Sequence, residues 1–147
     1  MTEKLKSWTK KIAIVLSLII VVFCLFYIVV FPLSFLPNGY TIISETDTTV
    51  VVKGLTLFGT EDVRYEYEPK DAIFTLEEFR SIIKKQKDFY WLLYSFVTLS
   101  IIYFIRLRRK GKRFPRALFD SNLLFSIFIP IIPLRNYLIV IDALLSA

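Results

Sequence analysis

Three long apolar runs, separated by polar segments, dominate the pattern of hydrophobic and polar positions. The first is 12–31, twenty residues without a charge, and four lysines precede it at positions 4, 6, 10 and 11. Twenty helical residues measure about 30 Å, which is the thickness of the hydrocarbon core of a bilayer. We therefore predict a transmembrane helix over 12–36 that follows a short cytoplasmic segment, 1–11.

A cleaved secretory signal peptide also begins with a charged segment and an apolar run. Its apolar region is usually about 7–15 residues long and ends at a cleavage site of small residues. Here the run is longer, and bulky residues continue through Phe31, Leu33, Phe35 and Leu36. The pattern therefore favours an uncleaved signal anchor.

The second apolar run, 89–105, lies inside a stretch, 76–110, that contains neither Gly nor Pro. Thr75 and Glu78 have the spacing of a capping box, in which each side chain bonds the backbone N–H of the other residue. Five residues then recur with helical spacing on one face: Leu76, Phe79, Ile83, Gln86 and Tyr90. We predict one helix over 76–105 whose first third lies outside the membrane.

The segment between these two helices, 37–75, has the pattern of short strands. Pro37, Asn38 and Gly39 form a turn signal, and four β-like stretches follow at 40–44, 49–53, 55–58 and 63–67. We predict an antiparallel meander of three or four strands. The polar stretch as a whole, 37–88, has about 50 residues, which is too few for a comfortably stable domain. We therefore expect it to be stabilised by the adjacent helices or by a partner.

The third apolar run begins near residue 118 and continues to the end of the sequence. Residues 118–134 are long enough for one span, with kinks at Pro130 and Pro133. Residues 135–147 are too short for a further span and form either an interfacial helix or an extension of the third. The predicted fold class is an integral membrane protein with three transmembrane helices and a small extracytoplasmic α+β segment.

The net charge of +6 is unevenly distributed, and its distribution predicts the orientation. Residues 1–11 and 106–116 carry eleven basic residues and one acidic residue, whereas 37–88 carries seven basic and ten acidic residues. Cytoplasmic loops are enriched in Lys and Arg, so we place the N-terminus and a basic loop, 106–117, in the cytoplasm. The strand segment and the C-terminus then lie outside a plasma or inner membrane.

Composition narrows the class of protein further. Hydrophobic residues make up 55% of the chain and aromatic residues 16%, which excludes an ordinary soluble domain. A single cysteine excludes an internal disulfide. The chain has no His, and its one Cys lies inside the first apolar run. His-based acid–base catalysis, Cys–His nucleophiles and the common zinc sites are therefore excluded, and we predict no catalytic, cofactor-binding or metal-binding residues.

The basic loop is a candidate contact for anionic lipid headgroups, although its simpler role is to fix the topology. We expect no nucleic-acid partner, because an eleven-residue loop held at both ends presents no folded reading element. The residues of this candidate contact are Arg106, Arg108, Arg109, Lys110, Lys112, Arg113 and Arg116.

Polar residues at the ends of the third run form a second candidate, an intramembrane polar site of Asp120, Asn122 and Arg135. Ionisable groups inside a membrane are costly and usually functional. The structural interpretation is that Asp120 pairs with Arg116 at the start of a helix, while Arg135 extends toward the interface.

The second run carries a third candidate, a helix-packing face. Tyr94, Ser95 and Thr98 lie on one side of the predicted helix. Small and hydroxyl-bearing residues let neighbouring spans approach closely and hydrogen-bond, so we predict that this side packs against another span.

The predicted function is that of a small non-catalytic membrane protein, an accessory or interaction subunit of a membrane complex. Its expected partners are the lipid bilayer and another membrane or extracytoplasmic protein. One alternative is an immunity protein against a membrane-active toxin or bacteriocin. Another is a membrane enzyme or transporter that uses the intramembrane polar site.

Overall fold

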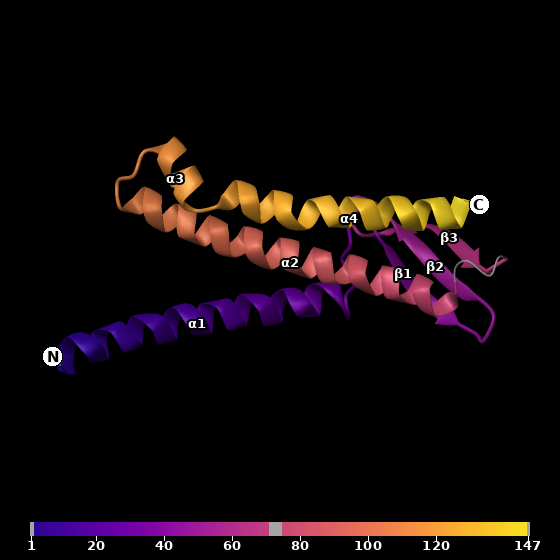
Figure 1. Cartoon of the computed structure of the whole chain (residues 1–147), viewed down its shortest axis with the longest axis horizontal. Coiled ribbons are helices and arrows are strands. Elements are labelled where there is room, and N and C mark those ends of the chain that lie inside the picture. Colours follow the sequence, from indigo (N-terminus) through magenta and orange to yellow (C-terminus); the bar gives the residue numbers. More distant parts are fainter. Residues whose placement is uncertain (1, 71–74, 147) are drawn as a thin grey trace.

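The computed structural model describes residues 2–70 and 75–146 of the chain (Figure 1). Within these residues the elements are, in order, α1 (Thr2–Val30), β1 (Tyr40–Glu45), β2 (Val50–Leu55), β3 (Glu61–Tyr67), α2 (Leu76–Arg109), α3 (Phe114–Asp120) and α4 (Leu123–Ser146). Three of the helices, α1, α2 and α4, are long and apolar enough to cross a membrane. Each of the three apolar runs therefore lies largely within one long helix.

The three long helices are not packed equally. α2 and α4 run side by side, and the sheet lies at the end where α2 begins and α4 finishes (Figure 1). We call this the sheet end, and we call the opposite end, where α2 leads to α3, the basic end. α1 meets α2 near the sheet end and diverges from it toward the basic end (Figure 1).

The start of α2 is set by local hydrogen bonds. The backbone N–H of Glu78 donates to the Thr75 hydroxyl at 3.3 Å, and the backbone N–H of Thr75 donates to the Glu78 carboxylate at 2.8 Å. This is the predicted capping box, and it is confirmed. The helix continues to Arg109, four residues beyond the predicted end, because Gly111, with φ +84°, is the first residue that turns the chain away.

The sheet has three strands in the order β1-β2-β3, and both pairs are antiparallel. Val52, in the central strand, pairs with Ile42 on one side and with Tyr65 on the other. The β-like stretch at 55–58 is not a separate strand. Leu55 ends β2, and residues 56–60 form a tight turn around Gly59, whose φ is +77°.

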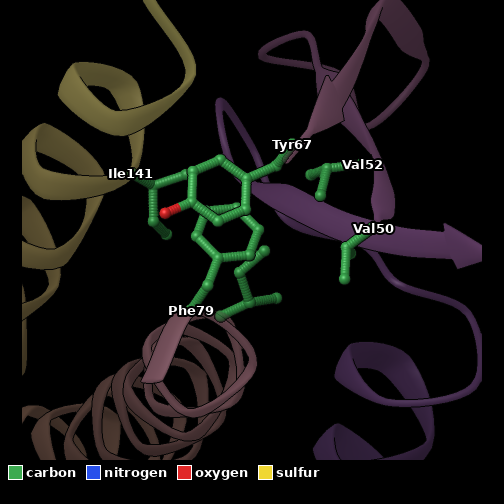
Figure 2. Close-up of a cluster of buried hydrophobic side chains, with 6 residues drawn as sticks. Val50, Val52, Tyr67, Phe79 and Ile141 are labelled. Carbon is green, nitrogen blue, oxygen red and sulfur yellow. The ribbon is translucent and has the colours of Figure 1, made fainter. Parts of the chain in front are cut away.

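The sheet has its hydrophobic core in common with the helices (Figure 2). Within it the ring of Tyr67 stacks on that of Phe79, with centroids 4.2 Å apart. The buried members come from β2, β3, α2 and α4, and they are Val50, Val52, Tyr67, Phe79, Ile83 and Ile141. The small sheet is therefore built onto the first turns of α2 and the last turns of α4.

The third long helix begins later than predicted. Residues 114–120 form the separate helix α3, with Pro115 in its first turn, where a missing N–H costs nothing. Asn122 then takes a positive φ of 55°, a conformation that Asn tolerates better than most residues and that separates α3 from α4. From Leu123 onward α4 continues without interruption through both prolines to Ser146. Residues 135–146 thus extend the third long helix.

Candidate functional site

Six polar side chains gather where the sheet meets the helices, and we call this group the junction. Its members are linked by hydrogen bonds and come from the segment after α1, from β1, from α2 and from α4: Ser34, Tyr40, Thr41, Gln86, Lys87 and Asp142. It consists of two hydrogen-bonded sets, Gln86 with Tyr40 and Asp142, and Lys87 with Ser34 and Thr41.

Gln86 is the buried centre of the junction. Its side chain is fully enclosed, and its amide binds both backbone groups of one residue of the sheet. The Oε1 atom accepts from the N–H of Tyr40 at 2.9 Å, and the Nε2 atom donates to the carbonyl oxygen of Tyr40 at 2.7 Å. The side chain therefore pairs with the edge of β1 as a neighbouring strand would.

Tyr40 links the sheet to the last turns of α4. Its hydroxyl donates to a carboxylate oxygen of Asp142 at 3.2 Å. Burial of the phenol, followed by the negative charge of Asp142, raises the pKa of Tyr40 to about 12. The phenol therefore stays protonated and remains a donor throughout the neutral range.

Lys87 holds the chain that leaves α1. Its ammonium donates to the hydroxyl of Ser34 at 3.4 Å, and the Thr41 hydroxyl lies 3.4 Å from the same oxygen. Burial, aided by the charge of Lys53, lowers the pKa of Lys87. An amine beside a serine hydroxyl can in principle activate a nucleophile, but both contacts exceed the usual length of a hydrogen bond. We interpret this part of the junction as structural.

The predicted packing face on α2 lies partly against α1. Ser95 is fully buried, and the ring of Tyr94 lies 5.7 Å from that of Phe26 in α1. Thr98 is half-buried. The hydroxyls of Ser100 in α2 and Ser126 in α4 are hydrogen-bonded across the interface between these two helices, and both serines lie outside the predicted packing face.

The seven residues of the basic loop lie at the basic end, and six of them are exposed. Arg106, Arg108 and Arg109 belong to the last turn of α2, where positive charge complements the helix dipole. The others surround the turn that leads into α3. Their concentration on one end of the molecule follows from the position of that turn.

The three residues of the predicted intramembrane polar site are not brought together. Asp120 ends α3 and forms an ion pair with Lys112 at 2.6 Å, so the expected pairing with Arg116 is wrong. The hydrogen bond to Lys112 lowers the pKa of Asp120, with a smaller contribution from the charge of Arg116. Arg135 is exposed on α4, about 18 Å along the helix from Leu123.

The described residues contain no group of three or more His, Cys, Asp or Glu side chains placed to hold a metal ion. Cys24 is exposed on α1. A shallow groove lined by Trp8, Ile12 and Arg106 lies where α1 diverges from α2.

Comparison of the chain with protein-family models, with curated proteins and with solved structures finds no match. Its function must therefore be argued from the arrangement of its own residues.

The sequence contained one usable signal for the junction. Gln86 is the only polar member of the otherwise apolar helical face that also includes Phe79, Ile83 and Tyr90. A buried amide needs hydrogen-bond partners, but nothing in the sequence identifies Tyr40, 46 residues away, as the partner.

Proposed function

We propose that the protein is a non-catalytic subunit of a membrane complex, held in a plasma or inner membrane by three spans with its N-terminus in the cytoplasm. The observation that carries this proposal is the poor packing of α1. This helix has 29 residues, yet only Val22 and Val30 are buried, and no residue of 2–20 is buried against the rest of the chain.

The aromatic contacts between α1 and α2 lie in the half of α1 near the sheet end. The rings of Phe23 and Trp91 meet edge to face with centroids 5.4 Å apart, and the indole N–H of Trp91 donates to the carbonyl oxygen of Phe23 at 2.8 Å. The remaining half diverges from α2 (Figure 1). Spans associate through close packing, and residues 12–20, the part of the predicted span with no buried residue, leave their helix surface for a span of another protein.

The sheet end supports the same proposal. Because the sheet is packed on α2 and α4, a partner bound outside the membrane meets a platform that is rigidly joined to two spans. The first four residues of β3, an edge strand, are exposed. Exposed strand edges are common sites of pairing with another chain.

The test is a photocrosslinking experiment in native membranes. A photoreactive residue at Ile14, exposed on the unpacked half of α1, should capture another membrane protein. The matched control is Phe128, which is equally apolar and is exposed on the well-packed helix α4. Extraction in mild detergent and native electrophoresis should show a species larger than the monomer.

A free monomer on the native gel, together with equal crosslinking from Ile14 and Phe128, would contradict the proposal. Co-purification of two differently tagged copies distinguishes self-association from a different partner.

A further inference from the structure

The turn between β2 and β3 exposes two large apolar side chains. Phe58 is 82% exposed, the most of any large hydrophobic residue described, and Leu57 is 63% exposed. No charged residue occurs from Gly54 to Thr60. Ordinary turns of soluble proteins are built from polar residues, Gly and Pro. An apolar turn of this kind therefore indicates that its side chains contact an apolar surface or phase.

The turn is rigidly built. The backbone N–H of Thr56 donates to the carbonyl oxygen of Thr60 at 2.8 Å, and that of Gly59 donates to the carbonyl oxygen of Thr56 at 3.0 Å. The two threonine hydroxyls lie 2.7 Å apart. A preformed tip loses little conformational entropy when it enters another phase, so its apolar surface is available for binding.

The position of the turn is set by the segment that leaves α1. The Asn38 N–H donates to the carbonyl oxygen of Thr56 at 3.1 Å. Gly59 lies so close to Phe35 that a Cβ atom built on the glycine would be 2.7 Å from the ring. Phe35 follows Val30, the last residue of α1, by only five positions. The turn therefore lies beside the sheet end of α1.

Exposed apolar side chains of the segment after α1 continue the same surface. Leu33 is 69% exposed and Phe35 is 41% exposed. We call these two residues, with Leu57 and Phe58, the apolar rim. The rim therefore lies beside the point in the chain where the first apolar run, 12–31, ends.

The turn at the opposite end of the sheet is polar. The turn between β1 and β2 contains Thr46, Asp47, Thr48 and Thr49 and is held by a hydrogen bond from the Thr46 N–H to the carbonyl oxygen of Thr49. A six-residue strand separates the two turns by about 20 Å. The sheet is thus apolar at the tip next to α1 and polar at the tip farthest from it.

We propose that the apolar rim inserts into the membrane, with Leu57 and Phe58 in the interfacial layer of the lipid leaflet nearest the sheet. Lipid is the occupant because the rim continues the apolar surface of a helix long enough to span a bilayer, and because its tip has no charge. Apolar side chains at that depth are stabilised by transfer out of water. The insertion holds the sheet at a defined height above the bilayer.

The experiment uses spin labels on the full chain, purified and reconstituted in phosphatidylcholine–phosphatidylglycerol vesicles. Cys24 is first replaced in C24S, and single cysteines are then introduced in F58C, in T48C as the water-exposed reference and in F125C as the lipid-exposed reference on α4. Phe58, Thr48 and Phe125 are all exposed, so the labels do not disturb the core. Collisions with oxygen report lipid, and collisions with a water-soluble nickel chelate report water.

The expected ratio of oxygen to nickel accessibility at position 58 is several-fold higher than at 48 and close to that at 125. A ratio at 58 equal to that at 48 would place the tip in water and overturn the proposal. Low accessibility to both reagents would place the tip under protein and overturn it equally. The vesicles contain only this chain, so the outcome does not depend on whether a partner subunit exists.

Discussion

Gln86 connects the sheet to α2 at the scale of a single residue, because its buried amide satisfies the N–H and the carbonyl oxygen of Tyr40 at the same time. The strand β1 is an edge of the sheet, and backbone groups on an edge that is covered by a helix have no access to water. The Gln86 amide, which can both donate and accept, supplies the partners that water cannot reach. Buried polar groups that lose such partners are costly.

We expect Q86L to lower the free energy of unfolding by about 2–6 kcal/mol, because two backbone groups of Tyr40 lose their partners and each costs about 1–3 kcal/mol. Q86E should be at least as destabilising at neutral pH, because it buries an unpaired carboxylate that faces the carbonyl oxygen of Tyr40 and cannot donate to it. Pulse proteolysis in mild detergent across a denaturant series measures the change.

The control is K85L, at an exposed neighbouring position on the same helix. If Q86L and K85L unfold at the same denaturant concentration as the parent protein, the amide does not stabilise β1.

At the scale of the elements, the lengths of α2 and α4 explain how the small sheet obtains a hydrophobic core. The 34 residues of α2 measure about 51 Å, and the 24 residues of α4 measure about 36 Å. Both exceed the roughly 30 Å of a hydrocarbon core. At the sheet end these two helices carry Phe79 and Ile141, which pack against the sheet (Figure 2). A three-stranded sheet, which is marginal alone, gains its core in this way.

We expect F79A to destabilise the sheet end by about 3–5 kcal/mol, the usual cost of replacing a buried Phe by Ala. Phe79 is fully buried and stacks on Tyr67, so the variant leaves a cavity between α2 and the sheet. Denaturant unfolding in detergent, followed by proteolysis within residues 40–67, measures the loss.

F58A is the matched control, because Phe58 is the same residue type and is highly exposed. Its effect in detergent should stay within about 0.5 kcal/mol. Equal effects of the two substitutions would show that the sheet does not rely on this core.

Charge and polarity give the whole molecule two distinct ends. The basic residues at the end of α2 and around α3 lie far from the sheet, at the opposite end of the long helices (Figure 1). Because cytoplasmic loops are enriched in Lys and Arg, we predict that the basic end lies inside and the sheet outside. Lys84, Lys85 and Lys87, near the sheet end, oppose this orientation but are fewer.

We expect T48C and K112C, each in the C24S background, to react with a membrane-impermeant thiol reagent on opposite sides of the membrane. In intact cells or right-side-out vesicles T48C should be labelled, and K112C should be labelled only after permeabilisation. C24S alone measures the background. Labelling of both cysteines from the same side would overturn the orientation.

Local patterns account for what could be predicted of the fold. The apolar runs predict α1, α2 and α4 because a long helix needs only continuous hydrophobicity and no breaking residue. Thr75 and Glu78 predict the start of α2 because a capping box involves residues three positions apart. The strands β1, β2 and β3 follow from short β-like stretches between turn residues, although the stretch at 55–58 also had that pattern and forms a turn.

The remaining features depend on contacts between residues far apart in the chain, and only the tertiary structure decided them. Gln86 meets Tyr40 across 46 positions, and Tyr40 meets Asp142 across 102. Asp120 pairs with Lys112, in the turn between α2 and α3, rather than with Arg116 of its own helix. The sequence by itself determined which segments are long apolar helices and where charge is concentrated, because both are properties of consecutive residues. The tertiary structure decided which faces of those helices are covered, because burial requires a partner brought from elsewhere in the chain.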